Sequence, residues 1–351
     1  MASGPIHFLH PGDINAPTGG YVYDRRLIAA LRAHGTPVTV LSLGGGFPLA
    51  GAPSRDRAEA IFSALPDGAV TVVDGLAYGA LDTVAARHGD RLQLIALVHH
   101  PLALETGLSE AEARRLAASE RAALAHARAV VTTSPATAES LAADFGVARD
   151  RLTVILPGLD PAPLAVGRDD GRLGLLAVGS LIPRKDYATL LAALKPLADR
   201  DWHLDIAGSA EFAPDYASSI TEIIGAYGLA DRITLHGAVG RDALEALYVA
   251  ADLFVLTTRY EGYGMAFTEA MAHGLPVVAT GDGAVRTTVP ESAGRVVAAG
   301  DVDGVRRALA ALIDDPDLRQ KLRRGARDHV ATLPTWRDAV TAMLGVIESL
   351  T

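Results

Sequence analysis

Short apolar runs of strand length alternate with helix-like segments along this chain of 351 residues, and this alternation limits the possible folds more than any other feature. The run 92–98 is continuously apolar, which is typical of a strand buried on both faces of a parallel sheet. In the first half of the chain the expected strands are 6–10, 38–43, 69–74, 92–98, 130–133 and 152–156. Repeated β/α units of this kind predict an α/β fold with a parallel, doubly wound sheet.

The alternation stops once, at the segment PGLDPAPLAVGRDDGR of residues 157–172. Its Pro, Gly and Asp content without periodicity is typical of a linker. Beyond it, strands are expected at 173–178, 203–207, 233–236, 253–256, 277–280 and 295–298. We therefore expect two Rossmann-like domains, 1–158 and 173–334, joined by a linker over 159–172, with a last helix in 335–351 that crosses back to the first domain.

The composition excludes several classes of protein. With 49% hydrophobic and 21% charged residues the chain can bury two cores as a soluble globular protein. The formal charge of −9 divides into −2 for residues 1–158 and −7 for the rest, so neither half offers a basic surface for nucleic acid. Cysteine is absent, which excludes disulfides and thiolate metal sites. Without a long apolar run or a basic leader at the N-terminus, we expect no transmembrane segment, no signal peptide and a cytoplasmic location.

The stretch YEGYGMAFTEAMAHGLPVVAT, residues 260–280, carries two carboxylates eight positions apart. Glu261 is expected in the turn after the strand 253–256, and Glu269 about one turn into a helix over 265–273. Ligands of open α/β sheets bind at the carboxyl ends of the strands. A carboxylate on a largely apolar helix needs hydrogen-bond donors, which the vicinal diol of a ribose or pyranose supplies. The alternative is a loop glutamate beside an exposed helical one.

A second candidate site follows the strand 173–178, where GSLIPRKD precedes a helix that begins at Tyr187. Arg184 and Lys185, together with the positive end of the helix dipole, suit a diphosphate. The segment matches neither the Walker loop nor the dinucleotide-binding pattern. The alternative is a pair of solvated surface cations.

The first half of the chain offers two weaker signals. Gly19 and Gly20 precede a helix expected over 21–33, where free N–H groups favour an anion, although a tight turn also explains the pair. His99 and His100 follow the strand 92–98, and since adjacent strand residues point to opposite faces, only one of them can face a ligand. Asp301 is better explained as a helix N-cap than as a metal ligand, and we expect no metal site.

These motifs together resemble the retaining glycosyltransferases of family 4, which have the GT-B fold of two facing Rossmann-like domains. The resemblance covers nearly the whole chain, through TGGY at 18–21, VHH at 98–100, VGSLIPRKD at 178–186, HGAV at 236–239 and EGYGMAFTEAMAHGLPVVAT at 261–280. The last of these contains the family's E-x7-E motif. One segment departs from the family pattern, because residues 281–287, GDGAVRT, lack the usual proline and acid.

The resemblance implies a site for the nucleotide part of a donor. Glu269 would hold the ribose diol, and the base would rest near Val239. Arg184 and Lys185 would neutralise the diphosphate. Gly20, from the other domain, would approach the distal phosphate.

The resemblance also implies contacts to the transferred sugar. Glu261 would grip its hydroxyls together with the N–H groups of Gly262, Tyr263 and Gly264. His99 matches the strand-end histidine of the family, close to that sugar.

The implied reaction is transfer of a sugar from a nucleotide diphosphate, with UDP as the expected nucleotide, to an unidentified acceptor hydroxyl with retained anomeric configuration. The residues implied in catalysis are His99, Arg184, Lys185 and Glu261, and no metal or other cofactor is implied. One alternative is a GT-B-shaped protein that binds a nucleotide sugar without transferring it. Another is an epimerase or phosphorylase of the same fold, although the sequence shows neither the carboxylate pair of the first nor the pyridoxal lysine of the second.

Overall fold

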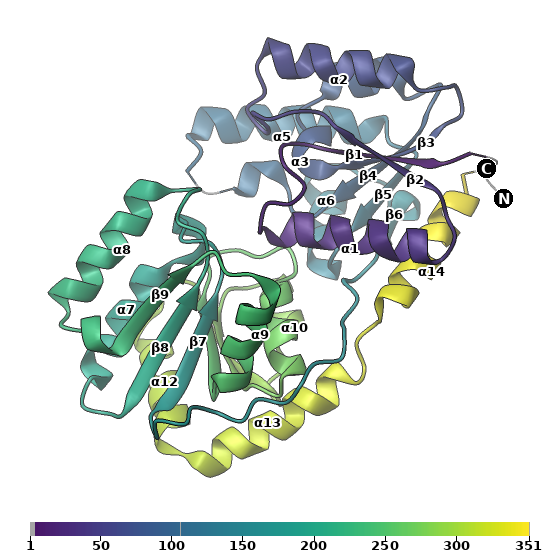
Figure 1. Cartoon of the computed structure of the whole chain (residues 1–351). Helices are drawn as coiled ribbons and strands as arrows, with labels where there is room; N and C mark the ends of the chain where they lie inside the picture. The colour runs from purple at the N-terminus through teal and green to yellow at the C-terminus, as the bar shows by residue number, and fades with distance from the viewer. Residues whose placement is uncertain (1–3, 106, 351) are drawn as a thin grey trace. The chain divides into compact units, whose positions relative to one another are not determined.

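The computed structural model describes residues 4–105 and 107–350, and the chain divides into two compact units (Figure 1). Unit 1 comprises Met1–Gly158 and Pro334–Thr351, and unit 2 comprises Leu159–Leu333. Each unit contains a six-stranded sheet in which all the strand pairs are parallel. The expected α/β fold with two doubly wound sheets is therefore confirmed.

The sheet of unit 1 has the strand order β2-β1-β3-β4-β5-β6. Its strands are β1 (Ile6–His10), β2 (Val38–Ser42), β3 (Val70–Asp74), β4 (Gln93–Val98), β5 (Ala129–Thr132) and β6 (Leu152–Val154). β4 lies between β3 and β5 and is buried beyond its first residue, which explains its continuously apolar sequence. Because β3 and β4 are parallel neighbours, their carboxyl ends meet at one edge of the sheet.

The helices of unit 1 are α1 (Gly19–Ala33), α2 (Ala52–Ala64), α3 (Gly75–Tyr78), α4 (Asp82–His88), α5 (Glu110–Ala125), α6 (Pro135–Asp144) and α14 (Trp336–Glu348). α1 begins two residues before the expected start, because the side chain of Thr18 accepts a hydrogen bond from the Tyr21 N–H and caps the helix. The glycine pair therefore lies inside the first turn. α14 packs beside α1, with the ring of Trp336 edge-on to that of Tyr23 at 5.6 Å (Figure 1).

Unit 2 has the strand order β12-β11-β10-β7-β8-β9. Its strands are β7 (Leu173–Val178), β8 (Trp202–Ala207), β9 (Ile233–Gly237), β10 (Leu253–Thr257), β11 (Val277–Thr280) and β12 (Gly294–Val297). Its helices are α7 (Tyr187–Leu194), α8 (Pro214–Ala226), α9 (Arg241–Ala250), α10 (Met265–Ala272), α11 (Ala284–Thr288), α12 (Val302–Asp314) and α13 (Pro316–Val330). β10 and β7 pair directly and in parallel, so the connections that follow these two strands lie side by side at the carboxyl edge of the sheet.

The expected linker, 159–172, contains no helix or strand and belongs to unit 2. The Ala165 N–H donates to the His273 carbonyl at 2.8 Å, and His273 Nδ1 lies 2.7 Å from the Pro163 carbonyl. Asp301 caps α12 by accepting a hydrogen bond from the Gly304 N–H at 2.8 Å, which confirms its expected role. Among the residues placed here, no helix is long and apolar enough to cross a bilayer.

One carboxyl group of unit 1 lies inside the protein. Glu120, on α5, is 1% exposed, and its Oε2 accepts a hydrogen bond from the Leu102 N–H at 2.9 Å. Its other oxygen has no hydrogen-bond partner within the described ranges. Burial raises the pKa of this carboxyl to about 8, so its neutral form dominates at neutral pH.

A raised carboxyl pKa makes unit 1 less stable in alkaline solution. The contribution of protonated Glu120 to the free energy of unfolding is complete below its ordinary pKa of 4.5 and is lost as the pH rises through about 8. Glu120→Gln keeps an acceptor for Leu102 and cannot ionise. We therefore expect the melting temperature of this variant, relative to that of the wild type, to rise as the pH increases from about 5 to about 9. Differential scanning fluorimetry measures this difference. Glu110→Gln, at an exposed position on the same helix, should show no such gain, and an equal response of the two variants would contradict the assignment.

Candidate functional site

Three charged side chains meet at the carboxyl edge of the unit 2 sheet. Glu261 lies in the connection from β10 to α10, and Arg184 and Lys185 lie in the connection from β7 to α7. Lys185 Nζ is 2.6 Å from Glu261 Oε1, and Arg184 Nη1 is 3.3 Å from Glu261 Oε2. The side chains are only 14% exposed for the lysine, 16% for the arginine and 8% for the glutamate. The alternative of two solvated surface cations is therefore wrong.

The electrostatics of this cluster favour the ionised carboxylate. Burial alone would raise the pKa of Glu261, but the charges of Lys185 and Arg184 outweigh burial and lower the pKa to about 2. With all three groups charged, the cluster carries a net charge of +1 in a place that water reaches poorly. Such a site attracts an anion more strongly than the same charge on an open surface.

Backbone contacts hold the two connections together around the cluster. Arg184 Nη1 also donates to the Tyr260 carbonyl at 2.9 Å, and the Arg184 carbonyl accepts from the Arg259 N–H at 2.8 Å. Gly264 has φ +90°, and a Cβ there would lie 2.5 Å from the ring of Phe267, so only glycine fits. The turn 262–264 directly follows Glu261 and leads into α10.

The N-terminus of α7 differs from the open helix end that the sequence suggested. Asp186 occupies the cap position in a left-handed conformation, with φ 46° and ψ 44°, and is 5% exposed. Its Oδ2 accepts from the Thr189 hydroxyl at 3.0 Å and lies 3.3 Å from Arg259 Nε. A carboxylate therefore already lies at the positive end of this helix, and the positive charge for an anion comes from Arg184 and Lys185.

Glu269 is half-buried on α10, and Tyr248 on α9 orients it. The Tyr248 hydroxyl donates to Glu269 Oε2 at 3.2 Å. The buried Tyr248 ring stacks on His273, with centroids 4.7 Å apart and an interplanar angle of 9°. Burial, followed by the Glu269 charge, raises the pKa of Tyr248, which keeps its hydroxyl proton available for this bond. Tyr248 was missed in the sequence, where it is one apolar position of a helix. Val239 lies half-buried between β9 and α9.

The atypical segment 281–287 leads into a helix whose last residue supports the turn at Tyr263. It forms the start of α11, and the Thr288 hydroxyl at the end of this helix donates to the Tyr263 carbonyl at 2.9 Å. Asp282 and Arg286 pair with each other at 3.0 Å on the surface. The helix that this segment begins thus has a structural contact with the turn, made by Thr288.

In unit 1, His99 lies against two buried aspartates. His99 Nε2 is 3.1 Å from Asp24 Oδ1 and 3.7 Å from Asp74 Oδ2. Asp24 is fully buried on α1, and Asp74 is 2% exposed at the end of β3. A Cβ on Gly20 would lie 3.0 Å from the His99 ring, so the structure brings these two expected site residues together. His100 points elsewhere and lies 3.0 Å from Glu105.

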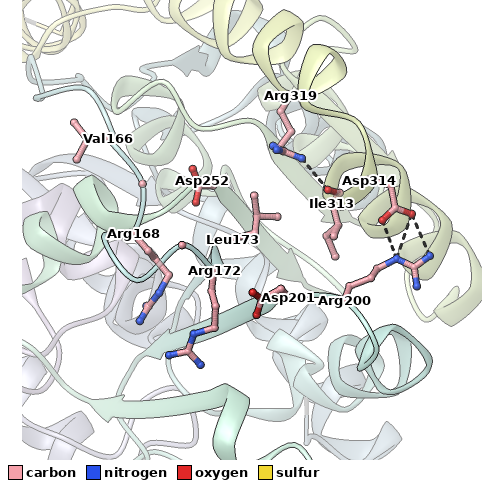
Figure 2. Close-up of a pocket in the computed structure, with 12 residues that line it drawn as sticks. Val166, Arg168, Arg172, Leu173, Arg200, Asp201, Asp252, Ile313, Asp314 and Arg319 are labelled. Carbon is pink, nitrogen blue, oxygen red and sulfur yellow. Dashed lines mark hydrogen bonds and ion pairs between the residues drawn. The ribbon is translucent and has the colours of Figure 1, made fainter.

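A separate cavity of about 510 Å³ opens at the opposite, amino-terminal ends of β7 and β8 (Figure 2). Its wall includes the four arginines Arg168, Arg172, Arg200 and Arg319. Asp170 pairs with Arg168 and Arg172 at 2.8 Å, and Asp314 pairs with Arg200 at 2.9 Å. Acids pair with three of these arginines, and Arg319 donates to the Leu312 and Ile313 carbonyls. Because ligands of such sheets bind at the carboxyl ends, this cavity is not the expected main site.

The sequence matches two family models that together span most of the chain. Residues 18–163 match the model described as Glycosyltransferase Family 4, and residues 165–329 match the model described as Glycosyl transferases group 1. The chain therefore belongs to the family 4 glycosyltransferases.

Curated relatives in this family include mannosyltransferases. MMP alpha-(1->4)-mannosyltransferase of Mycolicibacterium hassiacum is 26% identical over 270 residues, which are 73% of this chain and 65% of the relative. A GDP-mannose-dependent alpha-(1-6)-phosphatidylinositol monomannoside mannosyltransferase of Mycobacterium tuberculosis is 32% identical over 61% of this chain and 60% of the relative. The chain spans about half to two thirds of the length of the curated relatives it matches.

Solved structures share the fold. Sucrose-phosphate synthase of Thermosynechococcus elongatus matches with a TM-score of 0.83 and 22% identity, covering 99% of both chains. HepE of Anabaena, solved in complex with UDP-glucose, matches with a TM-score of 0.77 and 18% identity, covering 98% of this chain and 99% of the other. The GT-B fold implied by the sequence is confirmed.

The contact between Gly20 and His99 predicts a difference between two neighbouring glycines. A Cβ on Gly19 would meet nothing within 4 Å, whereas one on Gly20 would press on the His99 ring. Alanine is otherwise favoured in a helix by up to about 1 kcal/mol. We expect Gly19→Ala to keep or raise the melting temperature and Gly20→Ala to melt about 2–4 °C below it, by calorimetry. Equal melting temperatures would show that His99 does not need the space.

Proposed function

We propose that this chain is a retaining glycosyltransferase that moves a sugar from a nucleoside diphosphate to an acceptor hydroxyl. The observation that carries the proposal is the cluster of Arg184, Lys185 and Glu261, which combines a net positive charge with a carboxylate at the carboxyl edge of the unit 2 sheet. A nucleotide sugar needs both properties, because its diphosphate is an anion and its sugar presents hydroxyl donors.

Unit 2 would bind the donor. The two cations would face the diphosphate, and Glu261 would accept hydrogen bonds from the sugar beside the N–H groups of residues 262–264. Glu269, oriented by Tyr248, would hold the ribose diol, and the base would lie near Val239. A carboxylate has two acceptor oxygens, which suit the two hydroxyls of a ribose diol.

The proposed reaction uses charge rather than a covalent intermediate. The bond between the anomeric carbon and the phosphate oxygen breaks, and the acceptor oxygen bonds to that carbon on the same face. The configuration is retained because both bonds are on the same face, and the acceptor proton passes to the leaving phosphate. Arg184 and Lys185 stabilise the negative charge that develops on the diphosphate. Glu261 is engaged by both cations, which supports a binding role for it rather than that of a nucleophile.

Unit 1 would supply His99 and Gly20 and would bind the acceptor. His99 would contact the transferred sugar, and Gly20 would let the first turn of α1 approach the distal phosphate. The close packing of Gly20 on the His99 ring gives this glycine a second reason to lack a side chain.

Two nucleotides have support as the donor. UDP is implied by the resemblance of the motifs, and HepE, with the same fold, was solved with UDP-glucose. GDP is supported by the name of the mannosyltransferase that is 32% identical to this chain. We propose UDP-sugars as the first candidates and GDP-mannose as the second. A thermal-shift panel of UDP-, GDP-, ADP- and TDP-sugars separates them, because the true donor raises the melting temperature most.

The competing function is nucleotide-sugar binding without transfer, or epimerisation of the bound sugar. Both would give a positive binding panel. Release of free nucleotide that depends on an added acceptor distinguishes transfer from binding. Recovery of the donor with an altered sugar would indicate an epimerase instead.

The proposed diphosphate contact predicts the effect of losing one cation. Lys185→Ala should lower kcat by on the order of 10²–10³, because it removes charge stabilisation of the leaving group. Lys321→Ala, at an exposed position of α13 in the same unit, should retain wild-type turnover. Circular dichroism checks that both variants fold. Wild-type turnover in a folded Lys185→Ala variant would remove the diphosphate assignment.

The ribose contact predicts a loss of affinity. Glu269→Ala should weaken binding of the donor identified by the panel by about 1.5–3 kcal/mol in calorimetry, since hydrogen bonds to a charged group are lost. Tyr248→Phe should weaken it less, because the carboxylate remains and only its orientation is affected. If Glu269→Ala binds as tightly as the wild type, Glu269 does not hold the diol.

A further inference from the structure

Unit 1 contains two buried aspartates beside His99 that neither the resemblance nor the proposed function explains. Asp24 and Asp74 converge from α1 and from the end of β3 on the same ring nitrogen of His99. Asp24 is 0% exposed and Asp74 is 2% exposed. One carboxylate oxygen of each and a ring nitrogen of His99 lie within 4.8 Å of one another. Two carboxylates this close and this deeply buried cannot both ionise at low cost unless something neutralises them.

The surrounding groups are engaged elsewhere. Arg25 donates to the carbonyls of Ile14 and Ala16, although its charge still acts on Asp24. The Tyr21 hydroxyl donates to the Pro11 carbonyl at 2.8 Å, and the Tyr23 hydroxyl donates to the Ile155 carbonyl at 3.1 Å. Asp13, in the loop before α1, adds a further negative charge near Tyr21. Within the described ranges, none of these contacts places a cation directly on the carboxyl pair.

We propose that Asp24 and Asp74 hold one proton between them and position His99, whose Nε2–H donates to Asp24. The proton and the tautomer are argued from the geometry alone, and only the contact of His99 with a sugar rests on the proposed function. With Nε2 protonated, Nδ1 is the unprotonated nitrogen of the neutral ring. His99 then offers a hydrogen-bond acceptor to a hydroxyl group, which suits contact with a sugar better than an imidazolium would.

The titration of the three groups agrees with this arrangement. Burial, and for Asp74 also the charge of Asp24, raises the pKa of both carboxyls. Burial lowers the pKa of His99, while the Asp74 charge opposes that shift. The group is therefore least costly with one proton on the aspartate pair and a neutral imidazole. Loss of the shared proton in alkaline solution would leave two buried negative charges beside the ring and disturb its position.

A spectroscopic experiment tests the proton and the tautomer without any assay of activity. In the full-length protein labelled with 15N-histidine, two-bond 15N–1H correlations should show His99 as the neutral Nε2–H form from about pH 6 to about pH 8. The spectrum of His99→Gln identifies the signal. The infrared difference between wild type and Asp74→Asn should contain the band of a protonated carboxyl, which is absent from the difference between wild type and Asp90→Asn, an exposed control in the same unit. The protonated Glu120 cancels in both differences.

Three results would overturn the proposal. An imidazolium signal for His99 without a carboxyl band would mean an ion pair with both aspartates ionised. An Nδ1–H tautomer would mean that Nε2 accepts rather than donates. Stoichiometric binding of added Zn²⁺ or Mn²⁺ by the wild type, lost in Asp24→Asn, would mean a metal site instead. Each of these outcomes is independent of glycosyl transfer.

Turnover supplies a second readout. The kcat of the wild type should decline in alkaline solution as the shared proton is lost, whereas Asp74→Asn, which cannot lose it, should show a flatter profile. The ratio of kcat at about pH 9 to that at about pH 7 should rise at least about threefold in Asp74→Asn and stay at the wild-type value in Asp90→Asn. Equal ratios in all three proteins would contradict a positioning role. A protein with the spectroscopic signature and no transfer would refute the proposed function alone.

Discussion

The bonds from Glu261 to Arg184 and Lys185 are the interaction on which the account of unit 2 depends. Burying a carboxylate without partners costs free energy, and two cations confined beside each other repel. The opposite charges therefore lower the free-energy cost of burying one another. The cluster also ties the connection after β10 to the connection after β7. Because Glu261 has two cationic partners, the charge can be concentrated in one place within a stable fold, and one partner remains when the other is replaced.

The parallel sheet is the constraint that makes this cluster possible. The carboxyl ends of all strands in a parallel sheet lie at the same edge. Residues that follow two paired strands therefore become neighbours even when they are far apart in the sequence. β7 and β10 pair directly and bring together residues 184 and 261. In unit 1, β3 and β4 pair directly and bring Asp74 to His99. Each unit thus concentrates its unusual charges where its strands end.

The sequence predicts much of this arrangement for the same reason. The apolar runs locate the strands within one or two residues, and any polar residue just after a strand must lie at the carboxyl edge. That argument places Glu261, Arg184, Lys185 and His99. It does not reach Asp24 or Tyr248, because both lie on helices and their contacts depend on how each helix packs against its sheet.

Local backbone geometry accounts for the remaining differences. Asp186 was expected to precede an open helix end, but its left-handed conformation brings a carboxylate to that end, and a non-glycine residue gives little sign of this in sequence. The glycine pair lies inside α1 because the Thr18 side chain caps the helix earlier than the apolar pattern suggests. Caps and left-handed residues depend on single hydrogen bonds, whereas strands depend on many side chains and are therefore easier to predict.

The central claim is that the cluster of Arg184, Lys185 and Glu261 receives the diphosphate of a nucleotide sugar. A crystal structure with the bound nucleotide tests it most directly. The account predicts that the Lys185 ammonium and the Arg184 guanidinium lie within hydrogen-bond distance of diphosphate oxygens, with Glu269 on the ribose. A nucleotide bound elsewhere, while both cations remain on Glu261, would contradict it.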